Sequence, residues 1–122
     1  MRRTFVIAVL PNEIESRWLD WLQRLRSAIH AIPEADGDVI CLAITSSDSA
    51  ARSIKTDDRF SVLVDSDQRI RNRFLDDASQ GGLIVADRYG MIFHSATGDP
   101  EQPELNPDDV PSWIELIACR CS

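Results

Sequence analysis

The residues of this 122-residue chain whose types could do chemistry are few: three cysteines, two histidines and several pairs of aspartates. The closest pair of thiols is Cys119-Arg120-Cys121, near the C-terminal end of the sequence. Arg120 would favour a thiolate, and a disulfide across one residue would close a small strained ring that is easily reduced. We therefore treat Cys119 and Cys121 as a candidate catalytic pair, with an incidental helix tail as the alternative.

The other candidates are more typical of structural roles. Cys41 lies inside the apolar run Val39–Ile44, so we expect a buried and unreactive thiol. We interpret His30 and His94 as helix-end and surface residues. Aspartates close together occur at expected turns and helix starts, where Asp accepts hydrogen bonds from backbone N–H groups: Asp65, Asp67, Asp76, Asp77, Asp108 and Asp109. A metal protein or hydrolase built on these aspartates stays an alternative, but we expect no metal and no cofactor.

Composition restricts the partners. The formal net charge of −7 and the pI of about 4.7 argue against nonspecific binding to nucleic acid and against docking on anionic membranes. No apolar run approaches the roughly 20 residues that a membrane span needs. Two arginines precede the short apolar run Phe5–Leu10, which Pro11 ends; we interpret this segment as a strand rather than a signal peptide, and expect a cytoplasmic protein.

The elements that would position these residues follow from hydrophobic periodicity. Apolar runs predict strands at 4–10, 38–45, 61–64, 83–86 and 91–93, the last two joined by a turn in which Gly90 takes a positive φ. Helical spacing predicts a helix from Asn12 or Ser16 to Ile32, a shorter one over 49–55, one around 70–75, and one from Asn106 or Asp108 to Cys119. The segment 94–107, rich in proline and acidic residues, is expected to be a surface loop.

The order β-α-β-α-β-α-β-β-α predicts one α/β domain over residues 1–122. Alternating strands and helices indicate parallel pairing in the first half, and the closing hairpin makes the five-stranded sheet mixed. Helices are expected on both faces of this sheet.

This layout and three motifs resemble the thioredoxin-like fold, and within it the peroxiredoxins (alkyl hydroperoxide reductase and thiol-specific antioxidant proteins). The motifs are Ile44-Thr45-Ser46-Ser47-Asp48-Ser49, Phe60-Ser61-Val62-Leu63-Val64-Asp65-Ser66-Asp67, and the glycine-led segment from Gly82 to Ile92. The resemblance covers roughly residues 4–118. It implies a three-layer α/β/α sandwich and an antioxidant thiol chemistry.

The chain departs from that family at the residues that carry the chemistry. The resemblance places the peroxidatic cysteine just after the first strand, at the start of the first long helix, where the helix dipole stabilises a thiolate. Pro11 matches the family's proline, but the segment from Asn12 to Trp18 contains no cysteine. An activating arginine, or the cis-proline of thioredoxins, is expected at about the position of Gly81.

Besides the metal protein or hydrolase named above, two functions are favoured. In the first, the chain has lost peroxidase activity and is a binding or regulatory module, which contacts a protein partner or a second copy through Trp18, Trp21, Pro11 and Gly81. In the second, it is a divergent thiol oxidoreductase that uses Cys119 and Cys121. The second requires that the C-terminal pair reach the cleft near Asn12 and Gly81.

Overall fold

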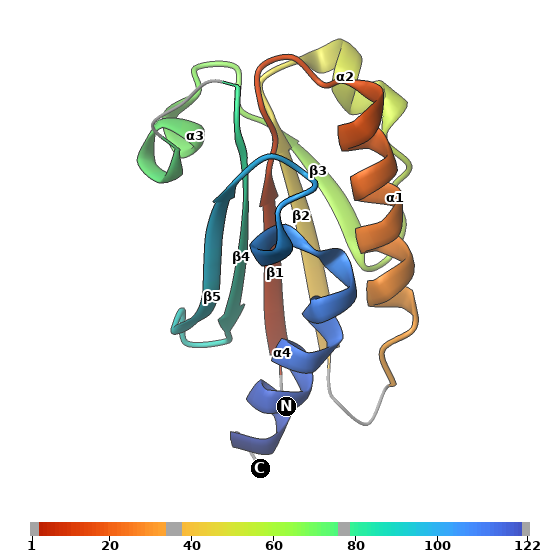
Figure 1. Cartoon of the computed structure of the whole chain (residues 1–122), viewed down its shortest axis with the longest axis vertical. Coiled ribbons are helices and arrows are strands. Elements are labelled where there is room, and N and C mark those ends of the chain that lie inside the picture. The colour runs from red at the N-terminus through yellow and green to blue at the C-terminus, as the bar shows by residue number, and fades with distance from the viewer. Residues whose placement is uncertain (1–2, 34–37, 76–78, 121–122) are drawn as a thin grey trace.

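The computed structural model describes residues 3–33, 38–75 and 79–120, and these form an α/β protein (Figure 1). The elements in chain order are β1 (Arg3–Val9), α1 (Ser16–His30), β2 (Asp38–Thr45), α2 (Asp48–Ser53), β3 (Phe60–Val64), α3 (Arg69–Phe74), β4 (Gly81–Asp87), β5 (Ile92–Gly98), the 3-10 helices η2 (Pro103–Leu105) and η3 (Pro107–Asp109), and α4 (Val110–Arg120).

The strands form one sheet in the order β3-β2-β1-β4-β5. β1, β2 and β3 are parallel, whereas β4 runs antiparallel to β1 and β5 antiparallel to β4. The register places Val6 between Cys41 and Val85, and the next residue, Ile7, points to the opposite face. The prediction of a mixed five-stranded sheet is confirmed.

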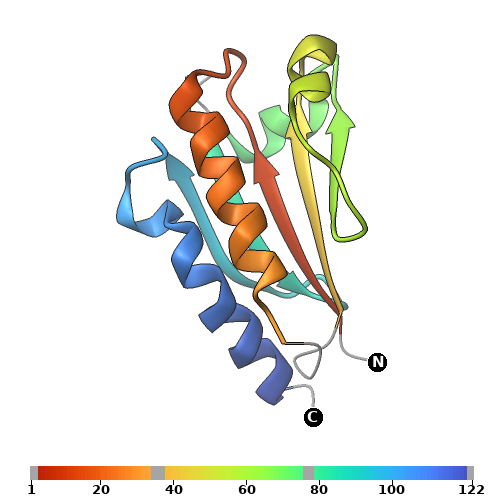
Figure 2. The same cartoon turned by 90° about the vertical axis from the view of Figure 1, so that its right-hand side faces the viewer.

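One face of the sheet is covered by α1 and α4, which pack side by side (Figure 2). The buried residues of α1 recur at helical spacing and pack on the row that contains Val6: Trp18, Trp21, Leu22, Leu25 and Ile29. Ile114 of α4 belongs to the same core. Trp21 Nε1 donates a hydrogen bond of 2.6 Å to the carbonyl oxygen of Leu105, which attaches η2 to α1.

The opposite face has much less helical cover. Of the helices that the structure describes, α3 alone lies on this face, at the end where the parallel strands terminate (Figures 1 and 2). Val9, Ile44 and Leu75 form a small buried cluster beneath it. The expected three-layer sandwich is therefore incomplete, because α3 has only six residues and ends before Leu75.

The element order also differs from the expected one, because two 3-10 helices precede α4. The predicted loop is wrong in its first part, since β5 continues to Gly98. Pairing with β4, from Ala86↔Ile92 to Gly81↔Gly98, outweighs the polar composition of this segment. The predicted turn is confirmed: Gly90 has a φ of 84°, and Asp87 Oδ1 accepts hydrogen bonds from the N–H groups of Tyr89 and Met91.

Helix starts follow local hydrogen bonding only in part. Ser47 caps α2 by accepting a hydrogen bond from the Ala50 N–H at 3.2 Å. α1 begins at Ser16, one of the two predicted starts, and its N-cap residue is Glu15, which makes no side-chain cap hydrogen bond. Over the described ranges, none of the helices is both long and apolar enough to cross a membrane.

Candidate functional site

The segments after β1 and before β4 meet at the end of the sheet where the parallel strands terminate. Arg71 of α3 joins them: its Nε donates to the carbonyl oxygen of Leu10 at 3.3 Å, and one terminal nitrogen donates to that of Gln80 at 3.0 Å. Pro11 and Gly81 directly follow these two residues, and both are buried. The structure thus brings Pro11 and Gly81 to neighbouring chain segments.

The space next to Gly81 is filled by the indole of Trp18. A Cβ atom built on Gly81 would lie 2.4 Å from Cη2 of Trp18, and 2.9 Å from both Cζ2 and Cζ3. Real side chains do not approach so closely, so any residue other than glycine would displace the indole. An arginine at position 81 is sterically incompatible with this position of Trp18.

The two tryptophans predicted as a contact surface are instead core residues. Trp18 is 0% exposed and Trp21 is 2% exposed, and their rings pack edge to face with centroids 5.2 Å apart. The expectation that either is exposed is wrong, because both point from α1 into the core under η2 and β4. Trp18 Nε1 has no hydrogen-bond partner among the described residues.

The two thiols that the structure describes are either buried or distant from this end of the sheet. Cys41 is fully buried on β2, and its burial, together with the negative charge of Asp57, raises the pKa of the thiol. The prediction of a buried Cys41 is confirmed. Cys119 is exposed on the last turn of α4, at the opposite end of the molecule from the start of α1 (Figure 1). Cys121 lies outside the described residues.

The predicted aspartate pairs have structural roles in part. Asp65 accepts hydrogen bonds from the N–H groups of Arg69, Ile70 and Arg71, which begins α3. Asp108 pairs with Arg24, and Asp67 lies 3.9 Å from Arg69. Asp76 and Asp77 lie outside the described residues. In the part of the chain that the structure describes, no three His, Cys, Asp or Glu side chains are grouped so that they could hold a metal ion.

The histidines are both engaged. His94 lies within β5, not at its end, and its ring stacks on Trp113 with centroids 4.9 Å apart. Its Nε2 lies 2.7 Å from the carbonyl oxygen of Glu104. His30 Nε2 lies 2.7 Å from Oδ2 of Asp57.

Asp57 is the most heavily hydrogen-bonded carboxylate of the described residues. Its Oδ2 accepts from Nε of Arg26 at 2.8 Å as well as contacting His30, and its Oδ1 accepts from the N–H groups of Arg59 and Phe60. Burial acts to raise the pKa of Asp57, but the hydrogen bonds from His30, Arg59 and Arg26 outweigh it and lower the pKa. Asp57 thereby ties the segment before β3 to α1.

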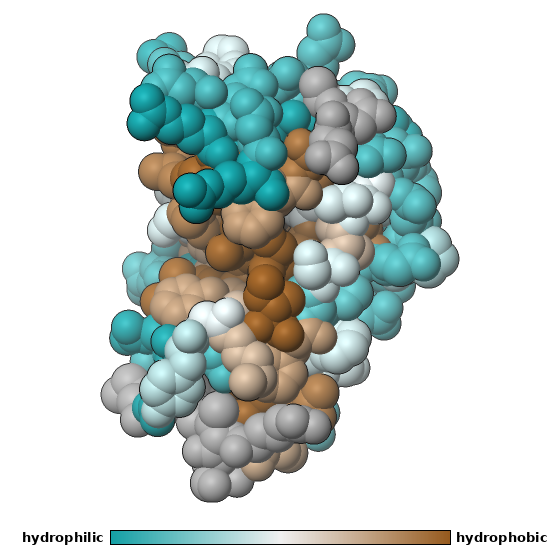
Figure 3. Space-filling view, turned by 90° about the vertical axis from the view of Figure 1, so that its left-hand side faces the viewer, coloured by the Kyte–Doolittle hydropathy of each residue, from teal (hydrophilic) through white to brown (hydrophobic). Residues whose placement is uncertain are grey.

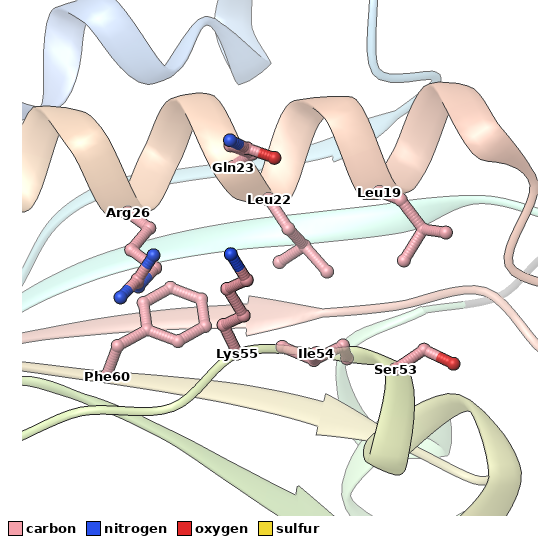
Figure 4. A pocket seen from close by; sticks show the side chains of 8 residues that line it. All are labelled: Leu19, Leu22, Gln23, Arg26, Ser53, Ile54, Lys55 and Phe60. Atoms are coloured by element: carbon pink, nitrogen blue, oxygen red, sulfur yellow. The ribbon is translucent and has the colours of Figure 1, made fainter.

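A hollow lies beside this cluster, between α1 and the segment that joins α2 to β3 (Figure 4). Its volume is about 130 Å³. Apolar and polar side chains from the two segments line it: Leu19, Leu22, Gln23, Arg26, Ser53, Ile54, Lys55 and Phe60.

The second surface of interest, after the hollow, is the sheet face opposite α1 and α4, which we call the open sheet face. Figure 3 shows a continuous hydrophobic area on this side of the molecule, below a hydrophilic end. Ile7 and Leu42, from the two central parallel strands, are half-buried on it. Leu63 on one side strand and Ile92 on another are 39% and 54% exposed, although their sheet partners Ile44 and Ala86 are buried.

Comparisons with known proteins give no family for the chain. No family model matches it, and no curated protein is significantly similar in sequence. The geometry is therefore the basis for assigning a function.

Sequence reasoning missed both surfaces and the role of Arg71. The spacing of Arg69, Arg71 and Arg73 suggests a solvated helix, yet Arg71 is 3% exposed. The continuous apolar run of β1 was consistent with cover on both faces, which is why the open face was not predicted. No local signal marks the hollow, because its lining comes from two segments about 30 residues apart.

Proposed function

We propose that this chain is a thioredoxin-like protein, similar in architecture to peroxiredoxins, that has lost peroxidase activity and binds a protein partner. Three parallel strands followed by an antiparallel pair, with a long helix after the first strand, support this relationship. The single observation that carries the functional part is the packing of Trp18 against Gly81.

The space and the chemical groups that peroxide reduction needs are both missing at this place. The segment between β1 and α1 supplies Glu13 and Glu15 but no thiol, and two carboxylates would repel a thiolate. Gly81 cannot be replaced by a larger activating residue while the indole is in place. Cys119 lies on the last turn of α4, at the other end of the molecule from the start of α1, which argues against its action beside Gly81.

Binding is supported by the uncovered sheet face. Exposed apolar area over several strands is typical of interaction surfaces. The end of this face is occupied by α3, whose exposed Arg69 and Arg73 flank Ile70. An amphipathic helix with an acidic end would cover the apolar strands and place its carboxylates near these arginines.

A second copy of the chain fits the face less well. The net charge of −7 opposes self-association. We therefore take the partner to be another protein, and expect the purified chain to be a monomer by light scattering.

The proposed loss of thiol peroxidase activity is tested by thiol titration and mass spectrometry before and after treatment with mild hydrogen peroxide. The wild type and Cys119→Ser are compared. Slow oxidation, no faster than for an ordinary exposed cysteine, is expected. Rapid loss of two thiols with a two-hydrogen decrease in mass, blocked by Cys119→Ser, would overturn the proposal in favour of a thiol oxidoreductase.

The binding half is tested by affinity capture with matched variants, followed by titration of each captured protein after purification. Leu63→Asp places a charge on the open face, and Leu116→Asp places one on α4 at a position of nearly the same exposure, 40% against 39%. A genuine partner should bind wild type and Leu116→Asp equally and Leu63→Asp about tenfold more weakly or worse. A partner insensitive to Leu63→Asp, or a dimer held by this face, would contradict the assignment.

A further inference from the structure

The hollow beneath α1 combines an apolar interior with a cationic side. Leu22 and Phe60 are both buried core residues, and Ile54 packs against the same core. Figure 4 shows Leu19 and Leu22 directed from α1 toward Ile54, with Lys55 and Arg26 on the side nearer Phe60. A ligand there would meet hydrocarbon in the middle and positive charge at one edge.

The two cations have donors to spare. Arg26 uses Nε for Asp57, and its two terminal nitrogens have no acceptor among the described residues. Lys55 likewise makes no hydrogen bond or ion pair with any described residue. Two such cations beside one hollow are unexpected in a chain of net charge −7.

The nearby acidic group does not compete for these donors. Asp57 already accepts hydrogen bonds at both oxygens, from Arg26 and His30 at Oδ2 and from backbone N–H groups at Oδ1. It holds the guanidinium of Arg26 in place and leaves the terminal nitrogens available. A guanidinium with two free terminal nitrogens is suited to a planar carboxylate.

We propose that this hollow is a binding site for a small organic carboxylate. The carboxylate lies between Arg26 and Lys55, and a short hydrocarbon tail lies against Leu22, Ile54 and Phe60. The volume of about 130 Å³ limits the tail to a few carbon atoms, and the apolar lining distinguishes the site from one for inorganic phosphate. This site is separate from the open sheet face and does not depend on the proposed partner.

The experiment is a titration of ¹⁵N-labelled protein with hexanoate, followed by backbone amide shifts. Acetate and hexanol are parallel probes, the first without the tail and the second without the charge. Lys55→Gln removes one cation, and Arg52→Gln, an exposed residue of α2 outside the lining, is the control with the same change in charge. Neither substitution removes a core contact, so both variants should fold.

Hexanoate should shift the amides of Leu22, Ile54 and Phe60, and should bind more tightly than either acetate or hexanol. Lys55→Gln should weaken hexanoate binding about five- to tenfold, as expected for loss of one charge-assisted contact, while Arg52→Gln should leave it unchanged. Shifts scattered over the surface, equal binding of acetate, or equal weakening by both substitutions would each overturn the proposal.

Discussion

The indole of Trp18 lies against Gly81 so closely that a Cβ atom on residue 81 would be 2.4 Å from Cη2. This contact joins the start of the first long helix to the start of β4. Under the proposed relationship to peroxiredoxins, these are the two places where the catalytic groups would be expected. Here they carry core packing instead, and neither position can be altered without affecting the other.

Gly81→Ala is expected to destabilise the protein by about 1–3 kcal/mol, because the added methyl group must displace a buried ring. Urea unfolding followed by circular dichroism measures the change. Trp18→Leu removes the ring that the added methyl group would displace. The loss of unfolding free energy in the double variant should therefore be smaller than the sum of the two single losses by about 1 kcal/mol or more. Strict additivity would show that the two residues are not in contact.

Asp57→Asn is expected to lower the free energy of unfolding at neutral pH by about 1–3 kcal/mol, because the hydrogen bonds from Arg26 and His30 lose their ionised acceptor. The pKa of Asp57 is lower in the folded protein than the value of about 3.9 in the unfolded chain. Its contribution is therefore fully present above that value and is lost as pH falls below it.

The difference in unfolding free energy between wild type and Asp57→Asn should accordingly become smaller only below about pH 4. Urea unfolding at a series of pH values measures it. The neighbouring exposed Asp58→Asn is the control and should change stability little at any pH. A difference that is constant down to strongly acidic pH would contradict the role given to the Asp57 carboxylate.

Arg71→Met should cost about 2–4 kcal/mol, because the carbonyl groups of Leu10 and Gln80 lose a buried charged donor. Arg73→Met, an exposed position on the same short helix, should change the unfolding free energy by less than about 0.5 kcal/mol. Thermal and urea unfolding of the two variants distinguish the effect of losing a buried guanidinium from the effect of helix propensity. Equal effects of the two substitutions would count against a structural role for Arg71.

The thiol of Cys41 should be unreactive in the folded protein, because it is fully buried and burial raises its pKa. In a Cys119→Ser, Cys121→Ser variant, an aromatic disulfide reagent should titrate no thiol in native buffer and one thiol in denaturant. Fast labelling under native conditions would mean that β2 is accessible at Cys41.

The sequence by itself determined the elements and most of the sheet. Continuous apolar runs at β1 and β2, helical spacing in α1, and the turn before Gly90 are local patterns, and local patterns predict local structure. The buried state of Cys41 followed from the same runs. The missing cysteine between Pro11 and Trp18 was also visible without coordinates.

The tertiary structure alone decided which side chains are buried and which surfaces stay open. Trp18 and Trp21 could have lain on either side of α1 until η2 and Gly81 were seen to close over them. The open sheet face depends on the length of α3, and the hollow beneath α1 depends on two distant segments meeting. Such features arise from long-range packing, which no periodicity within one segment encodes.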